Sequence, residues 1–296
     1  MKFGTKMNGY HIPVLLNEVI EALRVKPEGK YIDCTLGGGG HTEGILKAGG
    51  IVLAIDQDEE ALRYAEGKLQ FEIKNFKLNL RKANFAHLKE IALGAGFCPV
   101  DGILFDLGVS SHQLETDYRG FSFNTNARLD MRMDLTEQTV TARDLVNAGS
   151  EKELARLFWK YGEERAARII AKKIVEERRK KKIETAEELA KIILSVRSRT
   201  ARDRTHPATR VFQALRIAVN SELESLEEAL PQTEDLLVAG GRLAIISFHS
   251  LEDRIVKNFM KRSVWKVINR KPITPTEEEI RENPKARSGK LRIAQH

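Results

Sequence analysis

The chain has 296 residues, of which 49 are Lys or Arg and 42 are Asp or Glu, so its formal net charge at pH 7 is +7. This length allows one large domain or two modest ones with a sizeable core. The basic balance favours an anionic partner such as RNA or DNA, although a lysine-rich solvated surface would have the same charge. We find no signal peptide and no apolar run that could cross a bilayer, and therefore expect a soluble cytoplasmic protein without membrane contact. The two cysteines, Cys34 and Cys98, look like small core residues, and no Cys/His spacing predicts a metal site.

The first hundred residues alternate between strand and helix patterns. Strands are expected up to Asp33, at 51–56, near 76–80 and at 100–106. Helices are expected at 14–23, 59–69 and 85–93. Strands that are apolar almost throughout and alternate with helices are typical of a parallel sheet covered on both faces.

A glycine-rich loop follows the first strand, and it reads Asp33-x-Thr35-x-Gly37-Gly38-Gly39-Gly40-His41. Glycines let the backbone turn sharply and approach a ligand closely, and the helix that follows offers unpaired N–H groups. The second strand ends in Asp56 about 20 residues further on, the spacing at which a carboxylate reaches a ribose hydroxyl. Asp33 would repel a pyrophosphate but would attract the cationic S-adenosylmethionine. The charge of the loop therefore favours a methyltransferase over a nicotinamide enzyme.

The alternation stops after the fourth strand. No convincing strand lies between 117 and 205, where apolar stripes at i, i+3, i+4 and i+7 follow the capping boxes Ser150-x-x-Glu153 and Thr185-x-x-Glu188. We predict a Rossmann-like α/β domain made of 1–116 and 206–296, with an inserted all-helical domain at 117–205. The insertion would recognise the substrate.

Strand character returns near the C-terminus. The pair Gly240-Gly241 reads as a turn, followed by a strand at 242–249. Ser250-x-x-Asp253 is expected to cap a helix that runs through Met260. Segments 264–269 and 291–294 are expected to form a closing strand pair.

Ligands of open α/β sheets lie beyond the carboxyl ends of the strands. Asp106 ends the fourth strand there and is a candidate catalytic residue, with helix capping as the alternative. His249 ends the fifth strand, and a catalytic role and a hydrogen-bonded scaffold role are both open. Phe85 could lie against an adenine ring or be a plain core aromatic, and Gln113 could reach the cofactor or lie on the surface.

Basic residues gather in the insertion, near its return and at the C-terminus, where we expect phosphate contacts. They are Arg178, Arg179, Lys180, Lys181, Lys182, Arg197, Arg199, Arg202, Arg204, Arg210, Lys285, Arg287, Lys290 and Arg292.

Ten segments spread in order along nearly the whole chain make it resemble the RsmH (MraW) family of ribosomal-RNA cytosine-N4 methyltransferases. They are 11–16, the 33–41 loop, 54–56, 106–111, 119–123, 129–134, 161–165, 206–210, 220–223 and 246–254. The family usually has Pro where this chain has His112, which puts little in doubt.

The resemblance implies S-adenosylmethionine as methyl donor, with S-adenosylhomocysteine as product, and a cytosine in the decoding region of small-subunit (16S) ribosomal RNA as target. Carried over from the family, the cofactor-binding positions are Gly39, Gly40, His41, Asp56, Phe85, Asp106 and Gln113. The reading of the loop itself adds Asp33 and Gly37 to this set.

Two rival functions stay open from sequence. A methyltransferase acting on a protein or small molecule would be insensitive to RNase, and the basic insertion argues against it. A non-catalytic RNA-binding or assembly factor would bind the cofactor without turnover, and the intact loop with Asp56 and Asp106 argues against that.

Overall fold

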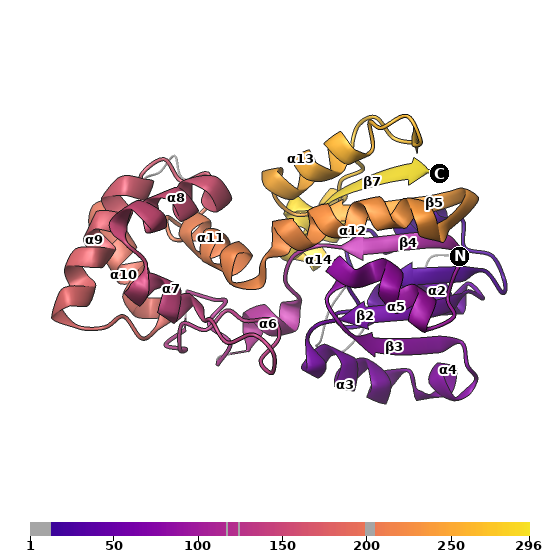
Figure 1. Cartoon of the computed structure of the whole chain (residues 1–296), viewed down its shortest axis with the longest axis horizontal. Coiled ribbons are helices and arrows are strands. Elements are labelled where there is room, and N and C mark those ends of the chain that lie inside the picture. Colours follow the sequence, from indigo (N-terminus) through magenta and orange to yellow (C-terminus); the bar gives the residue numbers. More distant parts are fainter. Residues whose placement is uncertain (1–12, 117, 124, 199–204) are drawn as a thin grey trace. The chain divides into compact units, whose positions relative to one another are not determined.

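The computed structural model describes residues 13–116, 118–123, 125–198 and 205–296. The chain divides into two compact units, one formed by residues 1–110 with 223–296 and the other by residues 111–222 (Figure 1). Three predictions fall partly outside the described residues, namely the start of the first family segment at 11–12, the boundary at 117, and Arg199, Arg202 and Arg204.

The first unit is built on a seven-stranded sheet with the order β3-β2-β1-β4-β5-β7-β6. The strands are β1 (Lys30–Asp33), β2 (Ile51–Asp56), β3 (Leu78–Lys82), β4 (Val100–Asp106), β5 (Leu237–Ser247), β6 (Lys266–Val267) and β7 (Lys290–Gln295). The pairs from β3 to β5 are parallel, whereas β7 runs antiparallel to both β5 and β6. The strand order reverses between β1 and β4, which is the place where such sheets bind ligands.

Helices cover both faces of this sheet, as the alternation of side chains along its strands requires. In β4, for example, Ile103 and Phe105 belong to one core and Leu104 to the other. The first core is closed by α5 (Leu88–Gly94), α12 (Glu222–Leu236) and α13 (Ser250–Phe259). The second is closed by α1 (Leu16–Leu23), α2 (Gly40–Lys47) and α3 (Glu59–Lys68). The remaining short helices of the unit are α4 (Gln70–Lys74), η1 (Phe85–His87), α14 (Glu277–Glu282) and η2 (Pro284–Ser288).

The predicted strands at 51–56 and 100–106 are confirmed, as is the antiparallel closing pair, observed as β6 and β7. The third strand begins at Leu78 because Phe76 has a left-handed backbone (φ 57°) and is 91% exposed, so it belongs to the preceding turn. The prediction of a turn at Gly240-Gly241 is wrong. Both glycines lie within β5, where the register with β4 shifts between Val100 and Gly102, so they accommodate an irregularity in a continuing strand.

The second unit is helical. Its helices are α6 (Ser111–Glu115), α7 (Ala142–Ala148), α8 (Glu151–Gly162), α9 (Ala167–Lys180), α10 (Ala186–Val196) and α11 (Thr209–Asn220). Both predicted capping boxes are present, with Ser150 and Thr185 accepting hydrogen bonds from the backbone of Glu153 and Glu188. Within its described residues the unit has an isolated bridge between Arg128 and Thr185 and no longer strand.

The second unit extends past the boundary that the sequence predicted at 205, because α11 packs against α8. The two helices approach so closely that a Cβ at Gly162 would lie 2.4 Å from the carbonyl oxygen of Arg210. The Rossmann-like α/β class with an inserted helical part is confirmed, and the division of tasks between the two parts stays a prediction. None of the described helices combines the length and apolarity that a membrane span requires.

Candidate active site

Three carboxylates mark the carboxyl ends of three adjacent strands in the first unit. Asp56 ends β2, Asp33 ends β1 and Asp106 ends β4, and these strands are neighbours in the order β2-β1-β4. The parallel ladder places all three at the same edge of the sheet, beside the glycine loop that follows β1. The convergence that the sequence predicted for them is therefore present, although their roles differ.

The glycine loop has the backbone that only glycine adopts readily. Gly37 (φ 49°) and Gly39 (φ 70°) are left-handed, and Gly39 is the N-cap of α2 with no side-chain cap on the helix among the described residues. Gly40 serves packing instead, because a Cβ there would lie 2.9 Å from Pro13. The loop therefore leaves backbone N–H groups at the start of α2 available to the carboxylate of an amino-acid moiety.

Asp56 closes the loop from the side of β2. Its Oδ2 accepts a hydrogen bond from the N–H of Gly37 (2.8 Å) and its Oδ1 accepts one from the N–H of Asp58 (2.8 Å). Removal of the carboxylate from water raises the pKa of Asp56 from 3.8 to about 7, against the lowering effect of these two N–H donors. The side chain is half-buried and suits the ribose-binding role predicted for it, since a second lone pair remains on each oxygen.

The affinity for S-adenosylmethionine is expected to rise with pH through neutrality. Ionised Asp56 accepts ribose hydroxyls better than the neutral acid, so a pKa of about 7 predicts a Kd about tenfold lower at pH 8 than at pH 6. The stability of the free protein depends on pH in the opposite direction. Because the folded protein has the raised pKa, the free energy of unfolding falls as the pH rises from 3.8 towards 7. Calorimetry at both pH values, with Asp56→Asn as the control whose Kd should be weaker and independent of pH, measures the effect. If the wild-type Kd were the same at pH 6 and pH 8, Asp56 would not be the ribose acceptor.

Asp33 is held by contacts inside the protein. The residue is completely buried, its Oδ2 accepts from the hydroxyl of Thr42 (2.7 Å), and its Oδ1 accepts from the N–H of Thr35 (3.1 Å). Burial raises the pKa of this carboxyl. Asp33 therefore fixes the loop onto α2, which favours a supporting role, and its predicted contact with the cofactor stays a prediction.

His41 links α2 to Asp106. Its Nε2 lies 3.0 Å from the carbonyl oxygen of Val14, which can only accept, so this nitrogen carries a proton. Its Nδ1 lies 3.5 Å from Oδ2 of Asp106. His41 is 4% exposed and lies between Val14 and Asp106, and its predicted contact with the cofactor stays a prediction.

Asp106 is held through its backbone as well. Its N–H donates to the hydroxyl of Thr35 (2.6 Å), and the next N–H, that of Leu107, donates to the carbonyl of Ile246 on β5 (3.0 Å). The chain then turns through Gly108, whose φ of 97° requires glycine. The sequence left open that Asp106 caps the next helix. That helix, α6, begins five residues later at Ser111, so Asp106 remains the candidate catalytic residue.

His249 caps a helix. Its Nδ1 accepts from the N–H of Glu252 (3.4 Å), and Glu252 accepts in return from the N–H of His249 (3.2 Å) and Phe248 (2.8 Å). The cap thus lies one residue before the predicted Ser250-x-x-Asp253 box, because the imidazole competes successfully with the hydroxyl. Of the two roles left open for His249, these contacts favour the scaffold.

Replacing His249 with Ala is expected to destabilise the protein by about 1 kcal/mol through loss of the cap, whereas His249→Asn, with a side chain that caps well, should be close to wild type. Methyl transfer should persist in both variants. Denaturant unfolding and the transfer rate check the two parts. An Asn variant that is stable but inactive would restore the catalytic role.

The two remaining cofactor candidates lie in different units. Phe85 is half-buried after β3 and contacts Phe105 edge-to-face at a centroid distance of 5.5 Å, which leaves part of its ring outside the core. Gln113 is buried in α6 of the second unit. Their contacts with the cofactor stay predictions.

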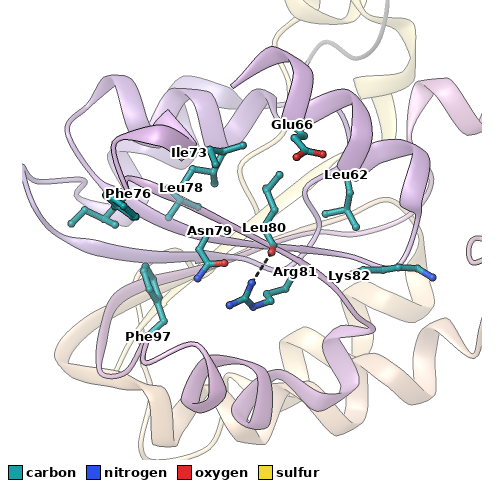
Figure 2. Close-up of a pocket in the computed structure, with 12 residues that line it drawn as sticks. Leu62, Glu66, Ile73, Phe76, Leu78, Asn79, Leu80, Arg81, Lys82 and Phe97 are labelled. Carbon is teal, nitrogen blue, oxygen red and sulfur yellow. Dashed lines mark hydrogen bonds between the residues drawn. The ribbon is translucent and has the colours of Figure 1, made fainter. Parts of the chain in front are cut away.

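A separate cavity of about 650 Å³ lies along the edge strand β3, between α3, α4 and Phe97. Figure 2 shows Phe76, Leu78 and Leu80 around it together with Arg81 and Lys82. None of the predicted cofactor or catalytic residues lines it. It is therefore distinct from the acidic strand ends.

Some of the basic residues predicted to contact phosphates have structural tasks. Arg292 is 8% exposed and forms a two-point ion pair with Asp253 (2.6 and 3.3 Å). Arg178 donates to the carbonyl oxygens of Val146 and Gly149 at the end of α7 (both 2.6 Å). These contacts give the two residues structural roles, and their predicted phosphate contacts stay a prediction. The side chains of Arg179, Lys180, Lys181 and Lys182 are exposed.

Sequence reasoning missed the residues that hold the site together. Thr35 and Thr42 orient Asp106 and Asp33, and the carbonyl of Val14 fixes the tautomer of His41. The Asx-type contact of Asp33 uses the N–H of Thr35, which any residue but proline would offer, so it does not single out the Thr35 hydroxyl. No local signal points to Val14, whose partner is 27 residues away.

The sheet order with its antiparallel β7, the glycine loop and the acidic strand ends define a class I methyltransferase. A profile of the MraW methylase family matches residues 8–296. The chain is 47% identical to the ribosomal RNA small subunit methyltransferase H of Fusobacterium nucleatum, covering 97% of this chain and 96% of that one. It is 44% identical to the protein of the same name from Brevibacillus brevis, over 98% and 99% of the two chains. An rRNA methylase structure from Streptococcus thermophilus aligns with a TM-score of 0.46 at 12% identity, over 96% and 97% of the chains.

The chain therefore belongs to the MraW methylase family, as its sequence motifs predicted. It is a methyltransferase, and S-adenosylmethionine is its methyl donor. The residues present fit this donor, because the left-handed glycines and the uncapped start of α2 leave backbone donors for its carboxylate, and Asp56 offers acceptors for its ribose.

Proposed function

We propose that this protein methylates the exocyclic N4 amine of a cytosine in the decoding region of small-subunit ribosomal RNA. The match to the MraW methylase family over residues 8–296 carries this proposal. Relatives that carry the name ribosomal RNA small subunit methyltransferase H, at 44–47% identity, support the ribosomal substrate. The net charge of +7 suits a polyanion.

S-adenosylmethionine supplies an activated methyl group, so the protein's task is to orient a weak nucleophile. The cytosine amine is conjugated with its ring, and it needs acceptors for its protons as it becomes cationic. The amine donates hydrogen bonds to Asp106 or to the backbone carbonyls of Leu107 and Gly108. Alignment of the amine nitrogen with the methyl group can contribute about 7 to 11 kcal/mol in the best cases.

The rigidity of this acceptor group follows from its contacts. Asp106 is held by Thr35 through its backbone and faced by His41 through its carboxylate, so it loses little freedom when the base arrives. The target base has to be unstacked to reach it, which is easiest in an irregular or single-stranded part of the RNA.

The test is incubation of the protein with labelled S-adenosylmethionine and small ribosomal subunits that lack the modification. Mass spectrometry of nuclease digests then locates the label. We expect a single N4-methylated cytosine, which the Asp106→Asn control should form about 10²- to 10³-fold more slowly. Label in protein, or transfer that survives RNase treatment of the substrate, would contradict the proposal.

A further inference from the structure

One face of α8 carries three basic side chains and one aromatic side chain that the site described above does not use. Lys152, Arg156, Trp159 and Lys160 follow one another at helical spacing. At about 100° per residue they fall within an arc of about 100° on the helix surface. All four are exposed, and Trp159 is 62% exposed. We call these four residues the α8 stripe.

The α8 stripe is fixed in place by the opposite face of the same helix. Leu154, Phe158 and Gly162 are buried there, and Gly162 is in close approach to α11. Within α8, all of which the structure describes, Trp159 is the one large apolar side chain with an exposed surface of this size. A single exposed aromatic side chain is common on protein surfaces, so the case for Trp159 rests on the three cations that lie beside it on the same face of the helix.

The acidic residues of α8 are kept away from the stripe. Glu153 folds back to accept a hydrogen bond from the N–H of Ser150 (2.7 Å), and Glu151 lies about 100° around the helix from Lys152. Glu163 follows the helix with a left-handed backbone (φ 48°), so it does not continue the face. Lys160 donates to the hydroxyl of its neighbour Tyr161 (2.9 Å) and remains exposed. The stripe is thus locally cationic.

We propose that the α8 stripe binds an unpaired segment of the substrate RNA, with one base stacked on Trp159 and phosphates beside Lys152, Arg156 and Lys160. An exposed aromatic ring between cations is the combination that recognises single-stranded nucleic acid, because every base has a π-face and every nucleotide a negative charge. The inference rests on the proposed function, and it adds a second RNA contact formed by residues of the helical unit.

Charge and composition favour RNA over the other partners that could cover this face. A helix that lies on a membrane turns its apolar face towards lipid, whereas the apolar face of α8 is buried in protein. A stable protein interface has a core of several apolar side chains, whereas the stripe has Trp159 alone among charges. Three cations around a single ring match a nucleotide.

Tryptophan fluorescence reports on the α8 stripe directly. The chain has two tryptophans, the exposed Trp159 and Trp265, which is 6% exposed in the first unit. Titration with a short unstructured oligoribonucleotide should quench the wild-type emission and leave that of Trp159→Phe, which retains Trp265 only, unchanged. Equal quenching in both proteins, or none in either, would overturn the proposal. This measurement needs no methyl transfer, so it stands or falls independently of the proposed function.

Steady-state kinetics on small ribosomal subunits give the second measurement. Trp159→Ala should raise the KM for the subunit by about 5- to 150-fold, the range expected for one stacked base, with kcat and the Kd for S-adenosylmethionine unchanged. The matched control is Ile169→Ala, which removes another exposed apolar side chain (59%) from α9 and should leave KM at the wild-type value. An unchanged KM in Trp159→Ala, with wild-type methylation intact, would overturn the stripe and leave the proposed function standing. If the KM for subunits rose but RNA did not quench the tryptophan emission, the stripe would bind a protein of the subunit instead of RNA. That result would also overturn the proposal.

Salt dependence tests the cations. The triple variant Lys152→Gln, Arg156→Gln, Lys160→Gln should reduce the slope of log binding constant against log salt by about 2, because each phosphate on a single strand contributes about 0.7. The control with the same loss of charge is Lys257→Gln, Lys261→Gln, Lys266→Gln, all exposed in the first unit. Equal slopes in the two triple variants would refute a specific role for the stripe.

Discussion

Replacing Asp106 with Asn is expected to lower the rate of methyl transfer by about 10²- to 10³-fold, the usual cost of removing one preorganised electrostatic group from a transition state. The amide keeps the shape of the side chain but loses the negative charge that stabilises the developing cation on the amine. The fold should persist, because the structural hydrogen bond of this residue is made by its backbone N–H to Thr35. Single-turnover transfer of a labelled methyl group to small subunits measures the rate, and calorimetry measures cofactor affinity separately.

The same strand offers a control for this substitution. Asp101 lies near the start of β4, where it accepts from the N–H of Lys30 (2.9 Å) and pairs with Lys26 (2.7 Å). Asp101→Asn removes an equal charge at the opposite end of the strand and should leave the transfer rate unchanged. If Asp106→Asn retained both the rate and the cofactor affinity, the assignment of Asp106 to the site would be wrong.

Replacing Gly120 with Ala is expected to destabilise the helical unit by about 2 to 5 kcal/mol. A Cβ at this position would lie 2.3 Å from the carbonyl oxygen of Arg128 and 2.7 Å from the N–H nitrogen of Asp130. Both neighbours are backbone atoms, so the clash cannot be relieved by a side-chain rotation. Overpacking costs about 1–3 kcal/mol, and the left-handed backbone (φ 73°) adds about 1–2 kcal/mol for a residue with a Cβ.

Urea unfolding followed by the emission of Trp159, which lies in the same unit, measures this effect. The control is Gly67→Ala in α3, where a Cβ meets nothing within 4 Å and where alanine should stabilise the helix by about 0.5–1 kcal/mol. A Gly120→Ala protein with the wild-type midpoint would mean that the segment around Arg128 can shift at little cost.

The elements that the sequence predicted well are those whose signal is local. The strands at 51–56 and 100–106 were predicted with their observed bounds. A short apolar run between turn residues fits only a buried strand where strands and helices alternate along the chain. The Ser150 and Thr185 caps were equally local. The helices α11 and α12 were missed, since each lies next to segments assigned to other elements and α12 contains Pro231.

The site was predictable in its position and less so in its roles. That acids at the ends of parallel strands converge follows from topology alone, and Asp56 and Asp106 lie where this rule puts them. That Asp33 accepts a hydrogen bond from Thr42, nine residues away, was not visible in the sequence. The His249 cap is local, with Glu252 three residues on, but His is not among the residues that usually cap a helix. Charge was the weakest guide. Arg292 and Arg178 bind partners inside the protein, whereas the exposed cations of α8 were not among the predicted phosphate contacts.

The pairing of β4 with β5 has a consequence for synthesis of the protein. Residues 111–222 lie between these neighbouring strands, and translation at about 5–20 residues per second takes on the order of ten seconds to make them. During that time β4 has left the ribosome with one edge unpaired. The helices α12 and α13, which pack on one of its two apolar faces in the folded protein, have not yet been made. The N-terminal half of the nascent chain therefore keeps an unpaired strand edge during that time, and residues 111–222 are made before β5 can pair with β4.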